Sequence, residues 1–165
     1  MHRTTLPALL TVIALVLAAC ATGQRFDTGY YDAKSRPADV AENPEPYADA
    51  AFLWGGVIVN SVNTQSGTQI EVLAYPLTSS QQPDPDAAPS GRFLISDPHY
   101  LETLDYAPGR LVTAGGTFNG TRSGQIGDAT YVYPVITPDR LRLWPKDSRR
   151  NEPQFHIGIG AVFGR

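Results

Sequence analysis

Two glycine pairs, Gly55–Gly56 and Gly115–Gly116, lie inside runs of β-branched and aromatic residues, and they constrain the fold of this chain more than any other feature. Glycine weakens a strand unless it permits a bulge, a sharp bend or the close approach of another backbone. Both pairs therefore predict strongly bent strands, of the kind found where a sheet closes into a barrel.

The region from Phe52 to Pro145 is typical of a small all-β domain. Short β-branched and aromatic runs alternate there with Gly, Pro, Asn and Ser. We expect strands at residues 52–62, 68–77, 91–96, 110–118, 130–137 and 141–144. The segment 78–90 contains three prolines and is expected to be an exposed loop.

Two local signals complete the predicted topology. Asp97 and Pro98 match the N-cap and first position of a helix, which predicts a short helix through Leu104. Asn119–Gly120 predicts a two-residue hairpin turn. Three strands, a short helix and further strands follow the order of a small OB-like β-barrel, closed or partly open, with additional strands.

The N-terminal residues match the layout of a secretory signal peptide. Arg3 precedes an apolar run over residues 8–17, shorter than the roughly 20 residues needed to span a bilayer. Ala18 and Ala19 before Cys20 resemble the bacterial lipobox, in which the cysteine sulfur receives a diacylglycerol and cleavage makes that cysteine the new N-terminus. We expect residues 1–19 to be the signal peptide and Cys20 to carry the covalent lipid. The alternatives are a secreted protein with a free Cys20 thiol and an uncleaved signal anchor.

The lipid on Cys20 is expected to hold the protein firmly on a membrane through its acyl chains, because two or three chains bind stably whereas one binds only marginally. Ala21 stands where inner-membrane lipoproteins often carry Asp, so the outer membrane is favoured.

Residues 20–51 are polar with three prolines and are expected to form a mostly irregular tether. Four aromatic residues of this tether could dock on the domain or lie at the membrane interface: Phe26, Tyr30, Tyr31 and Tyr47.

The C-terminal extension, residues 146–165, contains a Gly-Ile-rich run. It is expected to add an edge strand to the sheet, with packing on the membrane surface as the alternative. A run this short cannot cross a membrane as a helix.

The charge balance argues against nucleic acid as a partner. The chain has 13 Lys and Arg against 16 Asp and Glu, a net charge of -3, so no broad basic field exists. If the single cysteine is acylated, the domain has no internal disulfide and no thiol for catalysis or metal binding.

The sequence contains little that indicates catalysis or metal binding. It has no Gly-x-Ser-x-Gly motif, and His99 and His156 lack the spacing of a helical zinc site. Three carboxylates remain without a surrounding motif: Glu102, Asp105 and Asp128. An enzyme would need a rigid pocket that gathers these groups or His99. We therefore predict no enzymatic activity, no metal site and no cofactor other than the lipid on Cys20.

Aromatic residues on strands and strand ends offer one alternative function. Five could form a binding face for peptidoglycan, polysaccharide or a protein partner: Trp54, Tyr75, Tyr131, Tyr133 and Trp144. Their ordinary role is core packing with the polar tip in water. Both roles remain open at this point.

A set of short motifs resembles one known family in order and spacing. The motifs are Trp54-Gly55-Gly56-Val57-Ile58, Ile70-Glu71-Val72-Leu73, Tyr75-Pro76-Leu77, Gly91-Arg92-Phe93, Tyr106-Ala107-Pro108-Gly109-Arg110, Tyr133-Pro134-Val135 and Leu143-Trp144. Together with the lipobox they resemble the Slp family of bacterial outer-membrane lipoproteins. The resemblance covers about residues 52–145. It implies a starvation- or stationary-phase-associated lipoprotein of Gram-negative bacteria, on the periplasmic face of the outer membrane, with no established enzymatic activity.

Overall fold

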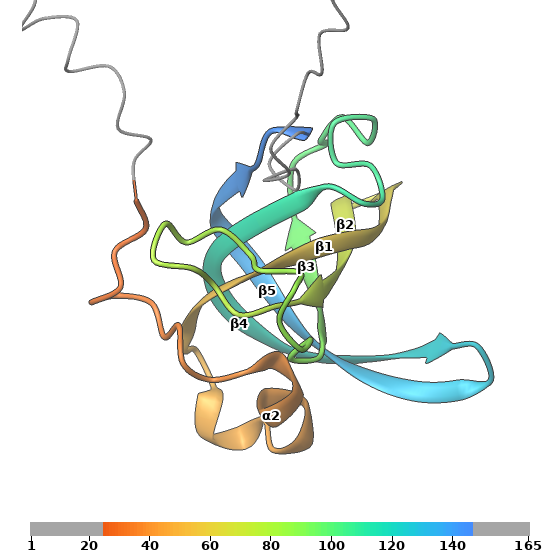
Figure 1. Ribbon diagram of the computed structural model, residues 1–165. Helices are drawn as coiled ribbons and strands as arrows, with labels where there is room; N and C mark the ends of the chain where they lie inside the picture. The colour runs from red at the N-terminus through yellow and green to blue at the C-terminus, as the bar shows by residue number, and fades with distance from the viewer. Residues whose placement is uncertain (1–24, 147–165) are drawn as a thin grey trace, which may run out of the picture.

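Strand β1 (Ala51–Thr64) pairs with two neighbours in succession, and this closes the sheet into a barrel (Figure 1). Its first half pairs with β4 and its second half with β2. Gly56 belongs to both ladders, because it lies opposite Val112 on one side and Ala74 on the other.

The computed structural model describes residues 25–146. The expected signal peptide, Cys20 and residues 147–165 of the C-terminal extension lie outside the described residues.

The remaining strands follow the predicted order along the chain. They are β2 (Gly67–Ala74), β3 (Arg92–Asp97), β4 (Leu111–Ile126) and β5 (Ala129–Leu143). The order around the barrel is β1-β2-β3-β5-β4, with antiparallel neighbours except for β3 and β5. This arrangement confirms the predicted OB-like barrel. The last two strands expected from the sequence are both parts of β5.

The glycine pairs allow neighbouring backbones to approach closely, which is one of the predicted roles. A Cβ atom on Gly56 would lie 2.0 Å from the carbonyl oxygen of Leu73. A Cβ atom on Gly116 would lie 2.4 Å from the carbonyl oxygen of Thr137, beside a bulge in the ladder between β4 and β5. Only a residue without a Cβ fits at either position.

Side chains that point into the barrel form an aromatic-rich core. Phe52 and Trp54 stack with ring centroids 4.3 Å apart, and Phe93 meets Trp54 edge-on at 5.2 Å. Aliphatic residues from all five strands complete this core: Ile58, Ile70, Val72, Ala74, Ile95, Val112, Ala114 and Ile136. Large buried rings contribute much of the apolar area that stabilises so small a barrel.

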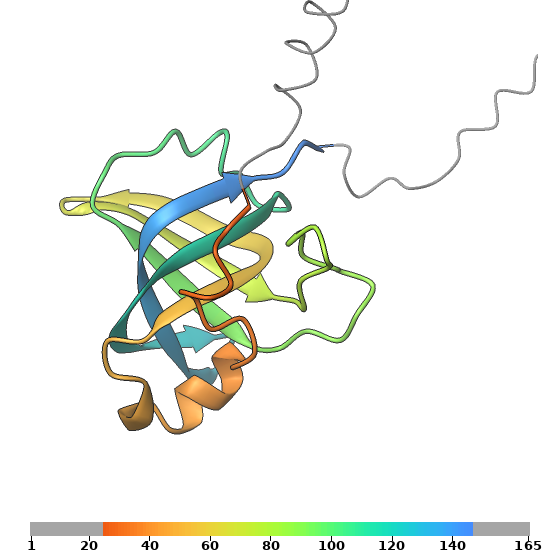
Figure 2. The same cartoon turned by 90° about the vertical axis from the view of Figure 1, so that its left-hand side faces the viewer.

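Residues 25–50 differ from the predicted irregular tether, because they pack on the barrel. They form α2 (Pro37–Glu42) and a 3-10 turn, η1 (Glu45–Tyr47). Val40 is fully buried in the barrel core, and the backbone N–H of Ala38 donates to the carbonyl oxygen of Ser90 at 3.1 Å. The helix therefore covers one end of the barrel (Figures 1 and 2). It is too short to show apolar periodicity in the sequence, which is why the pattern indicates a tether.

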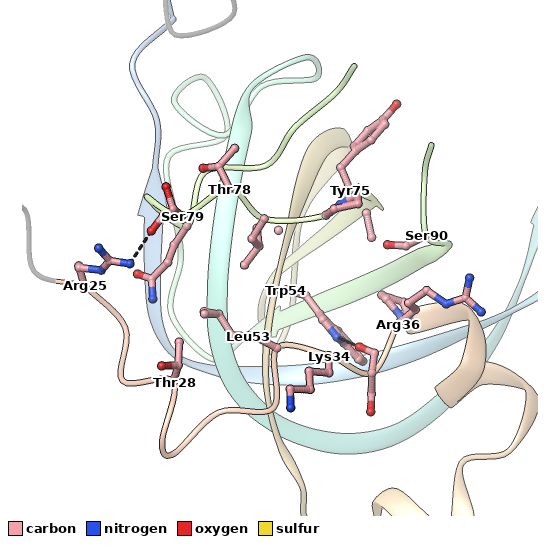
Figure 3. Close-up of a pocket in the computed structure, with 18 residues that line it drawn as sticks. Arg25, Thr28, Lys34, Arg36, Leu53, Trp54, Tyr75, Thr78, Ser79 and Ser90 are labelled. Atoms are coloured by element: carbon pink, nitrogen blue, oxygen red, sulfur yellow. Dashed lines mark hydrogen bonds between the residues drawn. The ribbon is translucent and has the colours of Figure 1, made fainter. Parts of the chain in front are cut away.

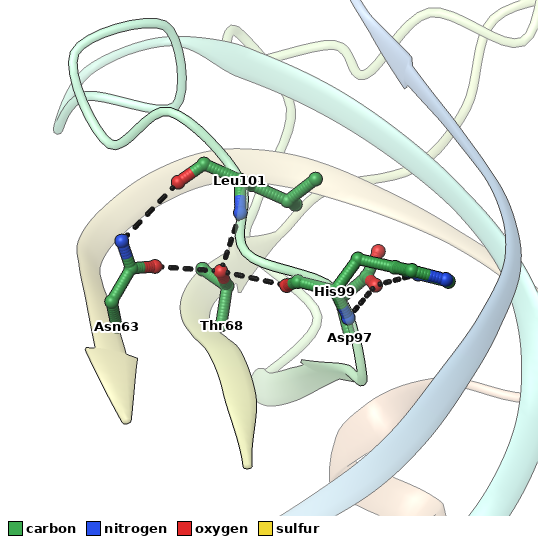
Figure 4. A network of polar contacts seen from close by, with 5 residues as sticks. All are labelled: Asn63, Thr68, Asp97, His99 and Leu101. Atoms are coloured by element: carbon green, nitrogen blue, oxygen red, sulfur yellow. Dashed lines mark hydrogen bonds and ion pairs between the residues drawn. The ribbon is translucent and has the colours of Figure 1, made fainter. Parts of the chain in front are cut away.

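The helix predicted at residues 97–104 does not form, so that prediction is wrong. Asp97 Oδ1 accepts the backbone N–H of His99 at 2.8 Å, and Thr68 Oγ1 accepts that of Leu101 at 2.8 Å (Figure 4). Side chains thus satisfy N–H groups that a helix would pair internally. The Asp–Pro signal marks an Asx turn here, which uses the same carboxylate geometry as an N-cap.

The predicted hairpin turn at Asn119–Gly120 is also in a different place. These two residues form a bulge within β4, where Gly120 has φ +77°. The turn between β4 and β5 lies at Gly127–Asp128, where Gly127 has φ +58°. Positive φ suits a bulge as well as a turn, so the signal alone cannot distinguish them. Residues 119–134 extend beyond the barrel as a two-stranded arm (Figure 1).

Candidate functional site

A cleft lies on the outer surface of the barrel, between the N-terminal segment and the loop that joins β2 to β3 (Figure 3). We call it the outer cleft. Residues 25–37 form one wall, residues 74–81 and Ser90 form the other, and β1 supplies the floor. Its volume is about 490 Å³. Sites for small ligands usually measure about 300–1,000 Å³, so the outer cleft has the size of a ligand site.

The floor of the outer cleft is apolar because β1 carries apolar residues on both of its faces. Phe52 and Trp54 pack in the barrel core, whereas Leu53 lies on the opposite face of the strand and is only 1% exposed. A Cβ atom on Gly55 would lie 2.8 Å from the Leu77 side chain. Glycine at this position therefore lets the β2–β3 loop lie close against β1.

Gln81 fixes the two walls of the outer cleft to each other. The backbone N–H of Phe26 donates to Gln81 Oε1 at 2.9 Å, and Gln81 Nε2 donates to the carbonyl oxygen of Phe26 at 2.9 Å. Thr113 Oγ1 donates to the backbone carbonyl of Gln81 at 2.7 Å, and Trp144 Nε1 donates to Thr113 Oγ1 at 3.0 Å. The loop 78–90 is therefore only partly exposed, contrary to prediction, since Gln81 is 4% exposed.

Further contacts hold the N-terminal segment on the outer face of β4 and β5. The Phe26 ring meets Tyr31 edge-on at 6.1 Å, and the Arg140 guanidinium lies 4.5 Å from the centre of the Phe26 ring. Burial raises the pKa of Tyr31, and the nearby negative charge of Asp139 raises it further. A Cβ atom on Gly115 would lie 2.7 Å from the Tyr31 ring, so this glycine makes room for the segment.

The charged residues that line the outer cleft are all basic. Arg25, Lys34 and Arg36 come from the N-terminal wall, and no carboxylate lines the cleft (Figure 3). Arg25 donates to the backbone carbonyl of Ser79, and Arg36 pairs with Asp39 at 2.5 Å outside the cleft. Lys34 makes no side-chain hydrogen bond or ion pair with any described residue. The cleft therefore combines an apolar floor with a positive edge.

Asp32 shapes the wall that carries Lys34. Its carboxylate accepts the backbone N–H of Lys34 at 2.7 Å and the hydroxyl of Ser35 at 2.6 Å. Its backbone joins β1, since Asp32 N donates to the carbonyl of Ala51 and the N–H of Leu53 donates to the carbonyl of Asp32. Burial acts to raise the pKa of Asp32, but these hydrogen bonds outweigh burial and the pKa is lowered.

We expect the stabilising contribution of Asp32 to depend on pH. A carboxyl group whose pKa is lower in the folded state stabilises that state fully above its unfolded pKa, about 4, and loses this effect as pH falls through the folded pKa. Asp32→Asn should therefore lower the free energy of unfolding by about 1 kcal/mol at pH 7 and by less at pH 3. Urea unfolding of both proteins at the two pH values measures this. An equal difference at both would contradict the assignment.

The five aromatic residues predicted as a possible binding face do not lie on one face. Trp54 is buried in the barrel core, and its Nε1 donates to the carbonyl of Ser35 at 2.8 Å. Trp54 and Tyr75 both line the outer cleft, whereas Trp144 is buried against Thr113.

The other two predicted aromatic residues lie together on the outer side of β5. The rings of Tyr131 and Tyr133 meet at 4.8 Å beside an ion pair of 2.6 Å between Arg92 and Glu71. Tyr133 Oη donates to Glu71 Oε1 at 3.1 Å, and Tyr131 Oη accepts the backbone N–H of Arg92 at 3.0 Å. Burial, followed by the charge of Glu71, raises the pKa of Tyr133. These polar groups are already paired with one another, so this cluster acts chiefly in packing.

The residues considered for catalysis or metal binding are not gathered into a site. His99 pairs with Asp97 at 2.9 Å, and the His99 side chain is 82% exposed. Among residues 25–146, no group of three or more His, Cys, Asp or Glu side chains could hold a metal ion. Glu102, Asp105 and Asp128 do not line the outer cleft.

No sequence pattern singles out the basic residues of the outer cleft. These basic residues belong to a segment whose composition predicts a tether, and no known motif surrounds them. One signal was available: Leu53 lies between Phe52 and Trp54, so β1 is apolar on both faces. A strand of this kind needs cover on its outer face as well as its inner one.

The model of the outer membrane lipoprotein Slp family matches residues 17–162. The chain belongs to this family. Membership confirms the resemblance and the outer-membrane localisation expected from the sequence. The Slp match begins at Leu17 and therefore includes the motif that ends at Cys20.

Two curated relatives are similar to this Slp family member. Outer membrane protein Slp of Escherichia coli K12 is 27% identical over 139 residues, which cover 83% of this chain and 73% of that protein. An uncharacterized protein of Haemophilus influenzae is 35% identical over 100 residues, which cover 60% of this chain and 54% of that protein. The match thus spans about half the length of the second relative.

Solved structures give a weaker likeness. The mitochondrial single-stranded DNA-binding protein Rim1 of S. cerevisiae covers 58% of this chain and is itself covered to 94%, with 12% identity and a TM-score of 0.38. A likeness at this level says nothing about a ligand of this Slp family member. Within residues 25–146, no helix is long and apolar enough to cross a membrane.

Proposed function

We propose that this protein is a non-enzymatic lipoprotein, anchored by acyl chains on Cys20, with a structural or stress-related role at the periplasmic face of the outer membrane. The observation that carries this proposal is the family match, which begins at residue 17 and so includes Cys20 and the small residues before it. A diacylglyceryl cysteine supplies two chains, enough for stable anchorage.

The lack of enzymatic activity is part of the proposal. It is supported by the exposed setting of His99 and by the positions of the candidate carboxylates. Glu102 and Asp105 share one loop turn, whereas Asp128 lies in the turn between β4 and β5. Catalytic acids and bases work in rigid, partly desolvated surroundings that tune their pKa values. The acidic side chains of Glu102, Asp105 and Asp128 are not brought into the outer cleft.

Replacing Cys20 tests the anchor directly. Cys20→Ser should abolish labelling by a radioactive or clickable fatty acid and prevent processing at residue 20, since serine cannot form the thioether. Salt-washed outer membranes should then contain at least tenfold less of the protein, which fractionation and immunoblotting measure. Ala21→Ser is the matched control and should stay labelled and in the outer membrane. Continued outer-membrane association of unlabelled, cleaved Cys20→Ser protein would refute the anchor.

A second candidate function, binding of an envelope component, is favoured by the outer cleft. A shared aromatic face for peptidoglycan or polysaccharide is less well supported than the outer cleft. Trp54, Tyr131 and Trp144 lie in three separate surroundings. A binding role would use the apolar floor and basic edge of the cleft instead. That chemistry suits an amphiphile better than an uncharged sugar chain.

A further inference from the structure

We propose that the outer cleft binds a single anionic phospholipid, with part of an acyl chain on the floor and the phosphate at Arg25 and Lys34. The lipid would come from the membrane in which Cys20 is anchored. This inference rests on the proposed anchorage at Cys20. It goes beyond anchorage because the bound lipid would be separate from the one attached to the chain.

The apolar part of the cleft matches hydrocarbon. Its floor and inner walls are formed by side chains without charge, among them Leu53, Leu77 and Pro76. A cleft of about 490 Å³ accommodates a segment of one chain and leaves the remainder outside. Burial of hydrocarbon is favourable by about 0.8 kcal/mol per methylene group, so even a short segment adds affinity.

The basic edge of the cleft matches a phosphate. The whole chain has a net charge of -3, yet the charged side chains that line this cleft are all positive. Arg25 uses one guanidinium nitrogen on the carbonyl of Ser79 and retains further donors. The Lys34 side chain makes no hydrogen bond or ion pair with a described residue, although its charge acts on the nearby Asp32, and its ammonium group has three donors. Charge-assisted hydrogen bonds from Arg and Lys are the usual means of holding a phosphate.

The position of the cleft in the chain places it close to the membrane. Arg25 follows Cys20 by five positions along the chain, and an extended chain covers at most about 3.6 Å per residue. The Cα atom of Arg25 therefore lies within about 18 Å of the Cα atom of Cys20. From Phe26 onward the segment is fixed to the barrel through Gln81. An acylated Cys20 would thus keep the basic edge near lipid headgroups.

Fluorescence quenching by brominated lipids tests the proposal. The chain has two tryptophans, and Trp54 lines the cleft whereas Trp144 does not. Full-length protein carrying Trp144→Phe reports on Trp54 alone, in non-ionic detergent micelles doped with brominated phosphatidylglycerol or brominated phosphatidylcholine. We expect half-maximal quenching at about fivefold less phosphatidylglycerol than phosphatidylcholine.

The two lysines of the chain, Lys34 and Lys146, provide a matched pair of variants. Lys34→Glu should abolish the preference for phosphatidylglycerol, whereas Lys146→Glu changes the net charge equally and should leave it intact. Native mass spectrometry of the protein with both tryptophans, incubated with each unbrominated lipid, repeats the comparison if Trp144→Phe does not fold. One phosphatidylglycerol adduct, lost in Lys34→Glu, is expected.

Three outcomes would overturn the proposal. Equal quenching by both lipids, unchanged in Lys34→Glu, would mean that micelle insertion and not the cleft brings the lipid close. Quenching by a brominated fatty acid alone would exclude a phospholipid. No quenching by any added lipid, with no lipid adduct in the mass spectrum, would leave the cleft empty or filled by the chains on Cys20.

The micelle assay does not require Cys20 to be acylated. A failure of lipid binding in this assay is therefore distinguishable from a loss of anchorage, which membrane fractionation reports.

Discussion

Gly56→Ala should destabilise the barrel by about 3 kcal/mol or more and leave a large fraction of the protein unfolded or aggregated. The added Cβ would lie 2.0 Å from the carbonyl oxygen of Leu73 and 2.7 Å from its carbonyl carbon. These are backbone atoms of the neighbouring strand, so no rotamer change can relieve the clash. Because Gly56 pairs with both β2 and β4, moving the backbone there disturbs two ladders at once. Urea unfolding followed by circular dichroism measures the loss.

Gly120→Ala is the matched control for this experiment. Gly120 has φ +77°, and no atom lies within 4 Å of the position that a Cβ would occupy. Its substitution should cost only the strain of a left-handed backbone, about 1–2 kcal/mol. Equal losses for Gly56→Ala and Gly120→Ala would show that close strand contact at Gly56 is not what requires glycine there.

Val40→Asp should be at least as damaging, although it changes a residue outside the barrel strands. Val40 is fully buried in the barrel core, where an ionised carboxylate would have no partner. An uncompensated buried charge costs about 3–5 kcal/mol, so the helix α2 should leave the barrel end or the whole domain should unfold. Limited proteolysis separates these results, because undocking exposes residues 25–50 to cleavage while the strands stay protected.

Ala38→Asp, two residues away on an exposed position of the same helix, should leave stability within about 0.5 kcal/mol of the unsubstituted protein. It adds the same charge without burying it. If Val40→Asp behaves like Ala38→Asp, α2 does not contribute to the core and residues 25–50 are a tether after all.

The barrel was largely predictable because its determinants are local. Alternating apolar and polar residues and turn residues indicate strands. The pairs Gly55–Gly56 and Gly115–Gly116 predict close contact with another segment, although the sequence does not show which segment. The partner at each glycine was not predictable. Gly56 lies against Leu73 of the next strand, whereas Gly115 accommodates the ring of Tyr31 from a segment more than eighty residues earlier.

The errors share one physical cause, which is that one local signal serves several structures. Asp97 caps an Asx turn where its sequence context indicates a helix, and Gly120 supplies positive φ to a bulge where a hairpin is expected. The helix that does form, α2, is anchored by Val40, and a single buried residue gives no periodic pattern.

The outer cleft could not be read from the sequence for a related reason. Its floor, basic edge and opposite wall come from β1, residues 25–37 and residues 74–81, and only tertiary contacts bring these together. The reciprocal hydrogen bonds between Gln81 and Phe26 join residues 55 positions apart. By contrast, the lipidation predicted at Cys20 depends on its immediate neighbours in the sequence alone.

The two-stranded arm, residues 119–134, has a consequence for how copies of the protein would meet on a membrane. In the barrel each strand has partners on both sides, but within the arm the described strands pair only with each other, so both outer edges keep unpaired backbone groups. Free edges are the usual starting points of strand-to-strand association. The proposed anchorage at Cys20 would confine molecules to two dimensions and raise their rate of collision. Arg122 and Pro134 in the arm, a charge and a residue without an N–H, are the kinds of residue that discourage such pairing.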